Sequence, residues 1–236
     1  MDLPRFIPLE PYQTHDIDES ISPLIMDQLF EEAFKTTRFT IFTAYDNNLG
    51  DRIYIEIIRP LSSSIMLCLK KSYGYSSVQI NQIHELLSII FDFNNRIYLW
   101  GDNLNYIMGI LEEYDLFVYD HILHPIDVFD VHEYFQDWYC YTFDGYPCSY
   151  PYKPFISLYE QYDLTYAIAY TFNLYLDINN DDYDNHLNQC LAITTLALVI
   201  QQQWTRKQIQ QYIRAYSMLH KRCGENELSS SSSSST

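Results

Sequence analysis

The chain has 236 residues, of which 47% are hydrophobic, so it is long enough to bury the core of one sizeable domain. Its 31 acidic residues outnumber its 14 basic residues, which gives a net charge of −17. A surface this acidic repels phosphate backbones and anionic membranes. Composition therefore argues against non-specific nucleic-acid binding by the whole surface, and no membrane partner is expected.

The five cysteines are odd in number and irregularly spaced, which is not typical of a disulfide framework. The first residues carry acids and prolines where a secretory signal has a basic stretch and then an apolar one. No apolar run approaches the ~18 residues that a membrane span needs. We therefore expect a reduced compartment, the cytoplasm or the nucleus.

The first part of the chain has the pattern of a three-stranded meander. Residues 1–22 lack periodicity and predict an irregular arm. A helix is expected at 23–34, followed by strands at 38–45, 52–59 and 63–70, which are rich in β-branched and aromatic residues. Their close spacing indicates antiparallel pairing. In the second strand, Ile53, Ile55 and Ile57 alternate with Tyr54 and Glu56, so the two sets face opposite sides of the sheet.

The pattern then changes to helices alternating with short strands. In chain order it predicts a helix at 76–91, a strand at 96–100, a helix at 104–114, a strand at 125–129, a helix at 131–141, a loop at 142–156, and helices at 156–176, 183–203 and 205–221. The serine-rich tail at 223–236 is expected to be disordered. The domain thus spans 23–222, as a mixed five-stranded sheet with helices on both faces.

Three blocks of sequence resemble the 3′–5′ exonuclease domain family of the ribonuclease H-like superfamily, and they occur in the family's order. The first block comprises TRFTIFTA at 37–44 and IYIEIIRP at 53–60. The second block is IYLWGDNL at 97–104, and the third is NHLNQCLAITTL at 185–196. The resemblance covers roughly residues 37–196 and implies the ribonuclease H-like fold.

The resemblance also implies a two-metal site, in which four carboxylates hold two divalent ions about 4 Å apart. The family's first two ligands are an aspartate and a glutamate two residues apart on the first strand, on one face. Phe42 and Ala44 stand at those positions, and neither can bind a metal. In the second block Tyr106 lies near the ligand position. In the third block Gln189 takes the aspartate's place and Asn185 the tyrosine's.

Other acids could in principle replace the missing ligands. Asp46 lies at the end of the first strand, Glu56 within the second, and Asp102 just before a helix. Their structural interpretations are a solvated strand end, a paired or edge glutamate, and a helix N-cap.

Two further groups of residues have a chemical character of their own. His121, His124, His132, Cys140 and Cys148 lack the spacing of zinc ligands. In the last helix, Arg206, Lys207, Arg214 and Lys221 lie opposite an apolar stripe. This basic face is either solvated or contacts nucleic acid or an acidic protein partner.

The leading hypothesis is a non-catalytic exonuclease-like domain, a pseudoenzyme kept as a binding or scaffolding module, with no metal cofactor expected. The alternative is a divergent exonuclease that acts on single-stranded nucleic acid through Asp46, Glu56 and Asp102, with magnesium or manganese. An open reading frame without a selected activity is the third hypothesis.

Overall fold

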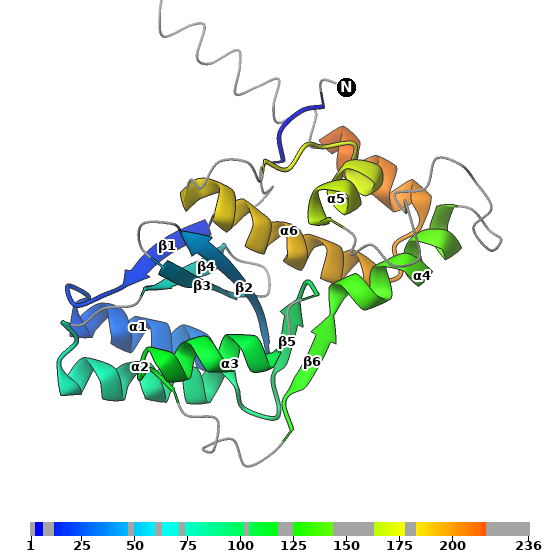
Figure 1. Cartoon of the computed structure of the whole chain (residues 1–236). Helices are drawn as coiled ribbons and strands as arrows, with labels where there is room; N and C mark the ends of the chain where they lie inside the picture. Colours follow the sequence, from blue (N-terminus) through cyan, green and yellow to red (C-terminus); the bar gives the residue numbers. More distant parts are fainter. Residues whose placement is uncertain are drawn as a thin grey trace, which may run out of the picture.

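The computed structural model describes residues 3–6, 12–46, 50–59, 63–70, 74–101, 104–117, 125–143, 163–177 and 183–215 (Figure 1). Its strands are β1 (Tyr12–Ile17), β2 (Arg38–Asp46), β3 (Gly50–Ile57), β4 (Ser64–Lys70), β5 (Arg96–Leu99) and β6 (Asp127–Asp130). Its helices are α1 (Pro23–Phe34), α2 (Ser77–Ile90), α3 (Leu104–Glu113), α4 (Val131–Phe143), α5 (Leu164–Phe172) and α6 (Tyr183–Gln201). A last helix occupies 206–215.

The strands form one mixed sheet in the order β1-β4-β3-β2-β5-β6. The strands β2, β3 and β4 pair antiparallel as a meander. The strand β5 then pairs parallel with β2, and β6 pairs parallel with β5. The α/β class and the ribonuclease H-like strand arrangement predicted from the sequence are therefore confirmed.

The N-terminal arm differs from its prediction. The segment Tyr12–Ile17 was expected to be irregular, but it forms β1, which pairs in parallel with β4 and extends the sheet from five strands to six. Only Ile17 of this strand is buried, so the strand lacks the regular apolar alternation by which strands are recognised. An edge strand can form in this way because its neighbour supplies the hydrogen bonds.

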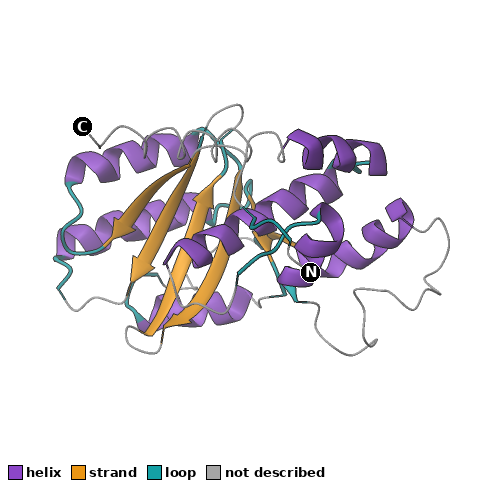
Figure 2. Cartoon of the chain, turned by 90° about the horizontal axis from the view of Figure 1, so that it is seen from above, coloured by secondary structure: helices purple, strands orange, loops and turns teal. Residues whose placement is uncertain are grey.

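Helices cover both faces of the sheet, as predicted (Figures 1 and 2). The helices α1, α2 and α3 pack on one face, against Ile53, Ile55, Ile57 and their neighbours. The helices α4, α5 and α6 lie on the other face, where Tyr54 belongs to the core. The strand β3 is thus buried on both sides, as expected for a central strand.

Two helix boundaries show how local sequence sets the elements. Ser76 and Gln79 form a capping box that starts α2, with Ser76 Oγ accepting from the backbone N–H of Gln79. The helix predicted at 156–176 is shorter at both ends. It begins at Leu164, where Asp163 is the N-cap and accepts from the Thr165 N–H at 3.0 Å, and it ends at Phe172. Asn173 closes α5 in the left-handed conformation, with φ of 58°, which stops the helix before Leu174. The predicted loop at 142–156 lies outside the described residues apart from 142–143, which belong to α4. The serine-rich tail lies outside them altogether.

Residues 3–6 are hydrogen-bonded to the linker between α5 and α6. Arg5 pairs in parallel with Tyr175. The backbone N–H of Phe6 donates to the Tyr175 carbonyl at 2.6 Å, and the Tyr175 N–H donates to the Pro4 carbonyl at 2.7 Å. The Phe6 side chain is fully buried in the core cluster to which α5 and α6 contribute. Residues 3–6 are therefore part of the folded domain.

Among the described residues, no helix is both long enough and apolar enough to cross a membrane.

The anchoring role of Phe6 can be measured. Phe6→Ala should lower the free energy of unfolding by about 3 kcal/mol or more, because it removes a fully buried ring and leaves a cavity. Phe93→Ala is the matched control, since that ring is 53% exposed, and should cost less than about 1 kcal/mol. Urea denaturation gives both values. Equal losses would show that residues 3–6 do not contribute to the core.

Candidate functional site

The candidate site lies where β2 and β3 meet the first turns of α6. Phe42 and Ala44 are two residues apart on β2, so both point to the α6 face, against which they pack. Across the sheet Phe42 is opposite Tyr54, and Ala44 is opposite Arg52. This is the face and strand on which the family resemblance places the first two carboxylates.

Four rings fill the space between these strands and α6. They are Phe42, Tyr54, Tyr183 and His186, which we call the aromatic cluster. The ring centroids of Phe42 and His186 are 6.4 Å apart, and those of Tyr54 and His186 are 5.4 Å apart. Tyr54 lies 6.2 Å from Phe42 and 6.1 Å from Tyr183. These separations are typical of packed aromatic pairs.

The polar atoms of the cluster have partners inside it or beside it. The Tyr54 hydroxyl and His186 Nδ1 form a hydrogen bond of 3.1 Å. The Tyr183 hydroxyl donates to Asp16 Oδ1 at 3.1 Å, and the Lys70 ammonium contacts Asp16 Oδ2 at 2.6 Å. The acid beside the cluster is thus engaged by a tyrosine and a lysine. Asp16 comes from β1, which the sequence pattern did not predict.

Burial keeps the hydroxyls and the thiol of this region neutral. It raises the pKa of Tyr54 and Tyr183 well above the usual value, and the nearby Asp16 carboxylate raises that of Tyr183 further. Burial also raises the pKa of the Cys68 thiol to about 11. A region with these properties disfavours added charge.

The third block of the resemblance begins α6 but carries no acid at the positions in question. Asn185 is buried, and its side-chain oxygen accepts a hydrogen bond from the Arg5 guanidinium. Gln189 is partly exposed on the same helix. In the second block, Tyr106 lies on α3 with 53% of its surface exposed, and its hydroxyl is 3.4 Å from Asp51.

Glu56 is buried beneath α6, with 1% of its surface exposed. Thr194 of α6 donates a hydrogen bond to its carboxylate, and the Thr194 and Thr40 hydroxyls are 2.5 Å apart. The carboxylate thus belongs to a polar contact between the sheet and α6. Such contacts are costly to leave half-made in a low-dielectric interior.

The alternative ligand set does not come together in this fold. The register places Thr40 opposite Glu56 and Gly50 opposite Asp46. Asp46 and Glu56 are therefore about 20 Å apart along the strands, at ~3.4 Å per residue. A metal pair spans only ~4 Å, so one centre cannot use both residues. Asp102 lies outside the described residues.

Other residues of metal-binding type are also dispersed. Among the described residues, no three His, Cys, Asp or Glu side chains are grouped so that they could hold a metal ion. His132 packs its ring against Trp100 at 5.3 Å, and Cys140 is disulfide-bonded. His121, His124 and Cys148 of the candidate zinc set lie outside the described residues.

The basic face of the last helix is exposed where it is described. Thr205 caps this helix, accepting from the Gln208 N–H at 3.5 Å while its own N–H donates to Gln208 Oε1 at 2.9 Å. Ile209 is buried on the α6 side. Arg206, Lys207 and Arg214 are exposed, and none of them forms an ion pair with a described residue. Lys221 lies outside the described residues.

Comparison of folds places the chain beside exonuclease domains. No protein-family model and no curated protein matches the sequence. Among solved structures, the EXO domain of Nibbler from Aedes aegypti has a TM-score of 0.52 and 10% identity, over 91% of this chain and 99% of that one. The EXD2 exonuclease domain soaked in Mn and GMP has a TM-score of 0.34 and 12% identity, and the match covers 80% of this chain and 86% of that one. The same domain soaked in Mg and GMP has a TM-score of 0.38 and 11% identity, and the match covers 90% of this chain and 95% of that one. At 10% identity the Nibbler likeness establishes the fold alone: this chain has the fold of a 3′–5′ exonuclease domain.

The buried contact between Glu56 and α6 predicts a specific stability loss. Thr194→Val should cost about 1–3 kcal/mol, because the Glu56 carboxylate loses a donor without becoming solvated. Thr195→Val makes the same change on the same helix, where the hydroxyl bonds only to the Leu191 carbonyl at 2.8 Å. It should change stability by less than about 0.5 kcal/mol. If chemical denaturation gave similar losses of unfolding free energy for both variants, the bond between Thr194 and Glu56 would not stabilise the packing of α6.

The raised tyrosine pKa values predict loss of stability in alkali. An unfolded tyrosine loses its proton near pH 10, while buried Tyr183 keeps its proton. Above about pH 10 the unfolded state therefore binds fewer protons, and stability falls as the pH rises; the contribution is complete below that pH. Denaturation midpoints measured from about pH 8 to 11 should fall less steeply in Tyr183→Phe than in the wild type. Parallel pH profiles would contradict the assignment.

Proposed function

We propose that this domain is a non-catalytic member of the exonuclease fold that serves as a binding or scaffolding module. The observation that carries the proposal is the aromatic cluster between β2, β3 and α6, on the face where a two-metal centre would need carboxylates. A packed set of rings stabilises the junction of sheet and helix, and the acid beside it, Asp16, is already bound by Tyr183 and Lys70.

The residues at the predicted ligand positions do not fit a pair of magnesium or manganese ions. Hard divalent cations need several oxygen ligands at about 2.0–2.6 Å. Phe42 offers a ring, Ala44 a methyl group and Gln189 a single amide. We therefore expect no metal cofactor, and we derive no hydrolytic step for this chain.

The acids that remain nearby are engaged in structure. Glu56 accepts from Thr194, and Asp16 is held by Tyr183 and Lys70. Moving either carboxylate toward a metal would break a contact that stabilises the domain. The hypothesis of a divergent exonuclease therefore rests on Asp46 and Asp102 without Glu56.

A binding role is supported by the distribution of charge. The protein has a net charge of −17, yet Arg206, Lys207 and Arg214 are exposed on one helix. Such a local basic surface attracts an anionic partner, either nucleic acid or an acidic protein, despite the repulsive net charge. We propose that this interaction takes place in the cytoplasm or nucleus, and the helical periodicity of the sequence assigns Lys221 to the same face.

The loss of metal chemistry is tested by calorimetry. Manganese is titrated into the wild-type protein and into a matched double variant, Asp46→Asn with Asp102→Asn. The acidic surface attracts divalent ions diffusely, so only a difference between the two titrations reports a built site. We expect the two curves to coincide up to ~1 mM manganese. A saturable wild-type curve for about two ions, absent from the double variant, would revive the exonuclease hypothesis.

The loss of hydrolysis is tested on labelled single-stranded DNA and RNA with added manganese. We expect both proteins to leave the substrates at full length. Shortening by the wild type alone would overturn the proposal. Equal shortening by both would identify a contaminating nuclease, because the variant lacks both acids on which the exonuclease alternative rests.

A further inference from the structure

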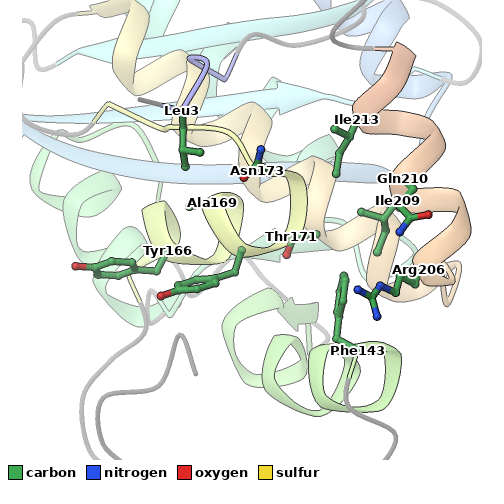
Figure 3. Close-up of a pocket in the computed structure, with 11 residues that line it drawn as sticks. Leu3, Phe143, Tyr166, Ala169, Thr171, Asn173, Arg206, Ile209, Gln210 and Ile213 are labelled. Carbon is green, nitrogen blue, oxygen red and sulfur yellow. The ribbon is translucent and has the colours of Figure 1, made fainter. Parts of the chain in front are cut away.

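A cavity lies outside the layer formed by the sheet and α6. Its volume is about 510 Å³, within the ~300–1,000 Å³ range of small-molecule sites. It is formed by α5, the last helix, the end of α4 at Phe143, and Leu3 (Figure 3). None of its lining residues belongs to the sheet or to α6, so it is separate from the aromatic cluster.

The walls of this cavity are suited to a flat ring. Tyr166 and Tyr170 lie one turn apart on α5, with ring centroids 6.3 Å apart and planes tilted by 33°. They keep 49% and 43% of their surface exposed. Ile209 and Ile213 of the last helix add aliphatic surface. Exposed aromatic rings beside aliphatic side chains in one cavity gain most by packing against a planar, largely apolar group.

Arg206 is the one charged side chain among the described residues that line the cavity. Its guanidinium lies over the Phe143 ring, 5.9 Å from the centroid, and Figure 3 places the two side by side at the end of the cavity away from Tyr166. Stacking on an aromatic ring leaves the in-plane N–H donors of a guanidinium available to an anion. The cavity therefore combines a ring-binding wall with an anion-binding end.

The walls also offer polar groups to the edge of a ring. Thr171 is 2% exposed, and its hydroxyl has no hydrogen-bond partner among the described residues. Asn173, at the left-handed end of α5, and Gln210, one turn after Arg206, each bring a side-chain amide to the lining. A buried hydroxyl without a partner costs stability, and a ligand that bonded to it would recover part of that cost.

We propose that this cavity binds a flat heteroaromatic anion of about nucleoside-monophosphate size. The ring packs against Tyr166, Tyr170 and Ile213, and the anionic group is held by Arg206. A free nucleotide and an unstacked nucleotide of a single strand share this chemistry. The inference gives a ligand to the proposed binding role and rests on it; the aromatic cluster and its metal assay are independent of the cavity.

The test uses the full chain and adenosine 5′-monophosphate as the probe, by calorimetry. Adenosine and inorganic phosphate are titrated separately, to isolate the ring and the anion. The monophosphate should bind at least about tenfold more tightly than either. Arg206→Gln should weaken the monophosphate about tenfold and leave adenosine unchanged. Lys35→Gln removes an exposed cation at the end of α1, on the other face of the sheet, and should change affinity less than about twofold.

Two further variants address the ring wall. Ala169→Trp fills the cavity and should abolish binding. Tyr170→Ala removes an exposed ring, and therefore tests the same wall if the tryptophan variant fails to fold; it should weaken adenosine and the monophosphate alike. Competition by a short single-stranded oligonucleotide would identify nucleic acid as the source of the ligand, and its failure to compete would identify a free nucleotide.

Three results would overturn the inference. The first is no binding of the monophosphate up to ~1 mM. The second is equal weakening by Arg206→Gln and Lys35→Gln, which would indicate diffuse attraction by the whole surface. The third is unchanged binding in both wall variants. Each is distinct from failure of the non-catalytic proposal, which would appear as metal-dependent shortening of a nucleic acid.

Discussion

The packing of α6 against the central strands is the contact on which the rest of this domain depends. The helix runs over β2, β3 and β5 on one side and is covered by α4 and α5 on the other, which explains why most of its residues are buried. Two different interactions hold it. Near its start, Tyr183 and His186 pack into the aromatic cluster. About two turns after His186, Thr194 bonds to Glu56 beneath the helix.

This contact also determines what the site can do chemically. A two-metal centre would require several carboxylates close together, and they repel one another strongly until cations neutralise them. Rings in the same space need no cation, and they gain energy from burial and edge contacts. The hydroxyls of Tyr54 and Tyr183 stay neutral because burial raises their pKa. The arrangement therefore favours a stable junction between sheet and helix over a charged one.

Segments at the edge of the domain also contact the start of α6. Residues 3–6 reach the linker before α6, and the Arg5 guanidinium bonds to Asn185 in its first turn. The edge strand β1 brings Asp16 to Tyr183. On the outer side, α5 and the last helix together form the cavity that contains Arg206. These peripheral segments thus hold the start of α6 and form a cavity separate from the aromatic cluster.

The sequence determined the elements whose signals are local. The alternation of Ile53, Ile55 and Ile57 with Tyr54 and Glu56 indicated a strand with two different faces, and the Ser76 capping box marked the start of α2. The order of strands and helices predicted a mixed sheet with helices on both faces, and the resemblance implied its ribonuclease H-like topology. Phe42 and Ala44 could be placed on one face of a strand because side chains alternate along it. That they occupy former ligand positions still rests on the resemblance.

Tertiary structure decided the features that depend on distant partners. Strand β1 has almost no apolar alternation, because it is an edge strand stabilised by hydrogen bonds to β4, and no local pattern records that pairing. The burial of Glu56 beneath Thr194, and its separation from Asp46, follow from strand register, which the sequence leaves open. Tyr183 and His186 meet Tyr54 only because α6 folds back over the sheet after more than a hundred residues. Periodicity predicts which face of an element is buried, whereas the partner across that face is fixed only when the chain has folded.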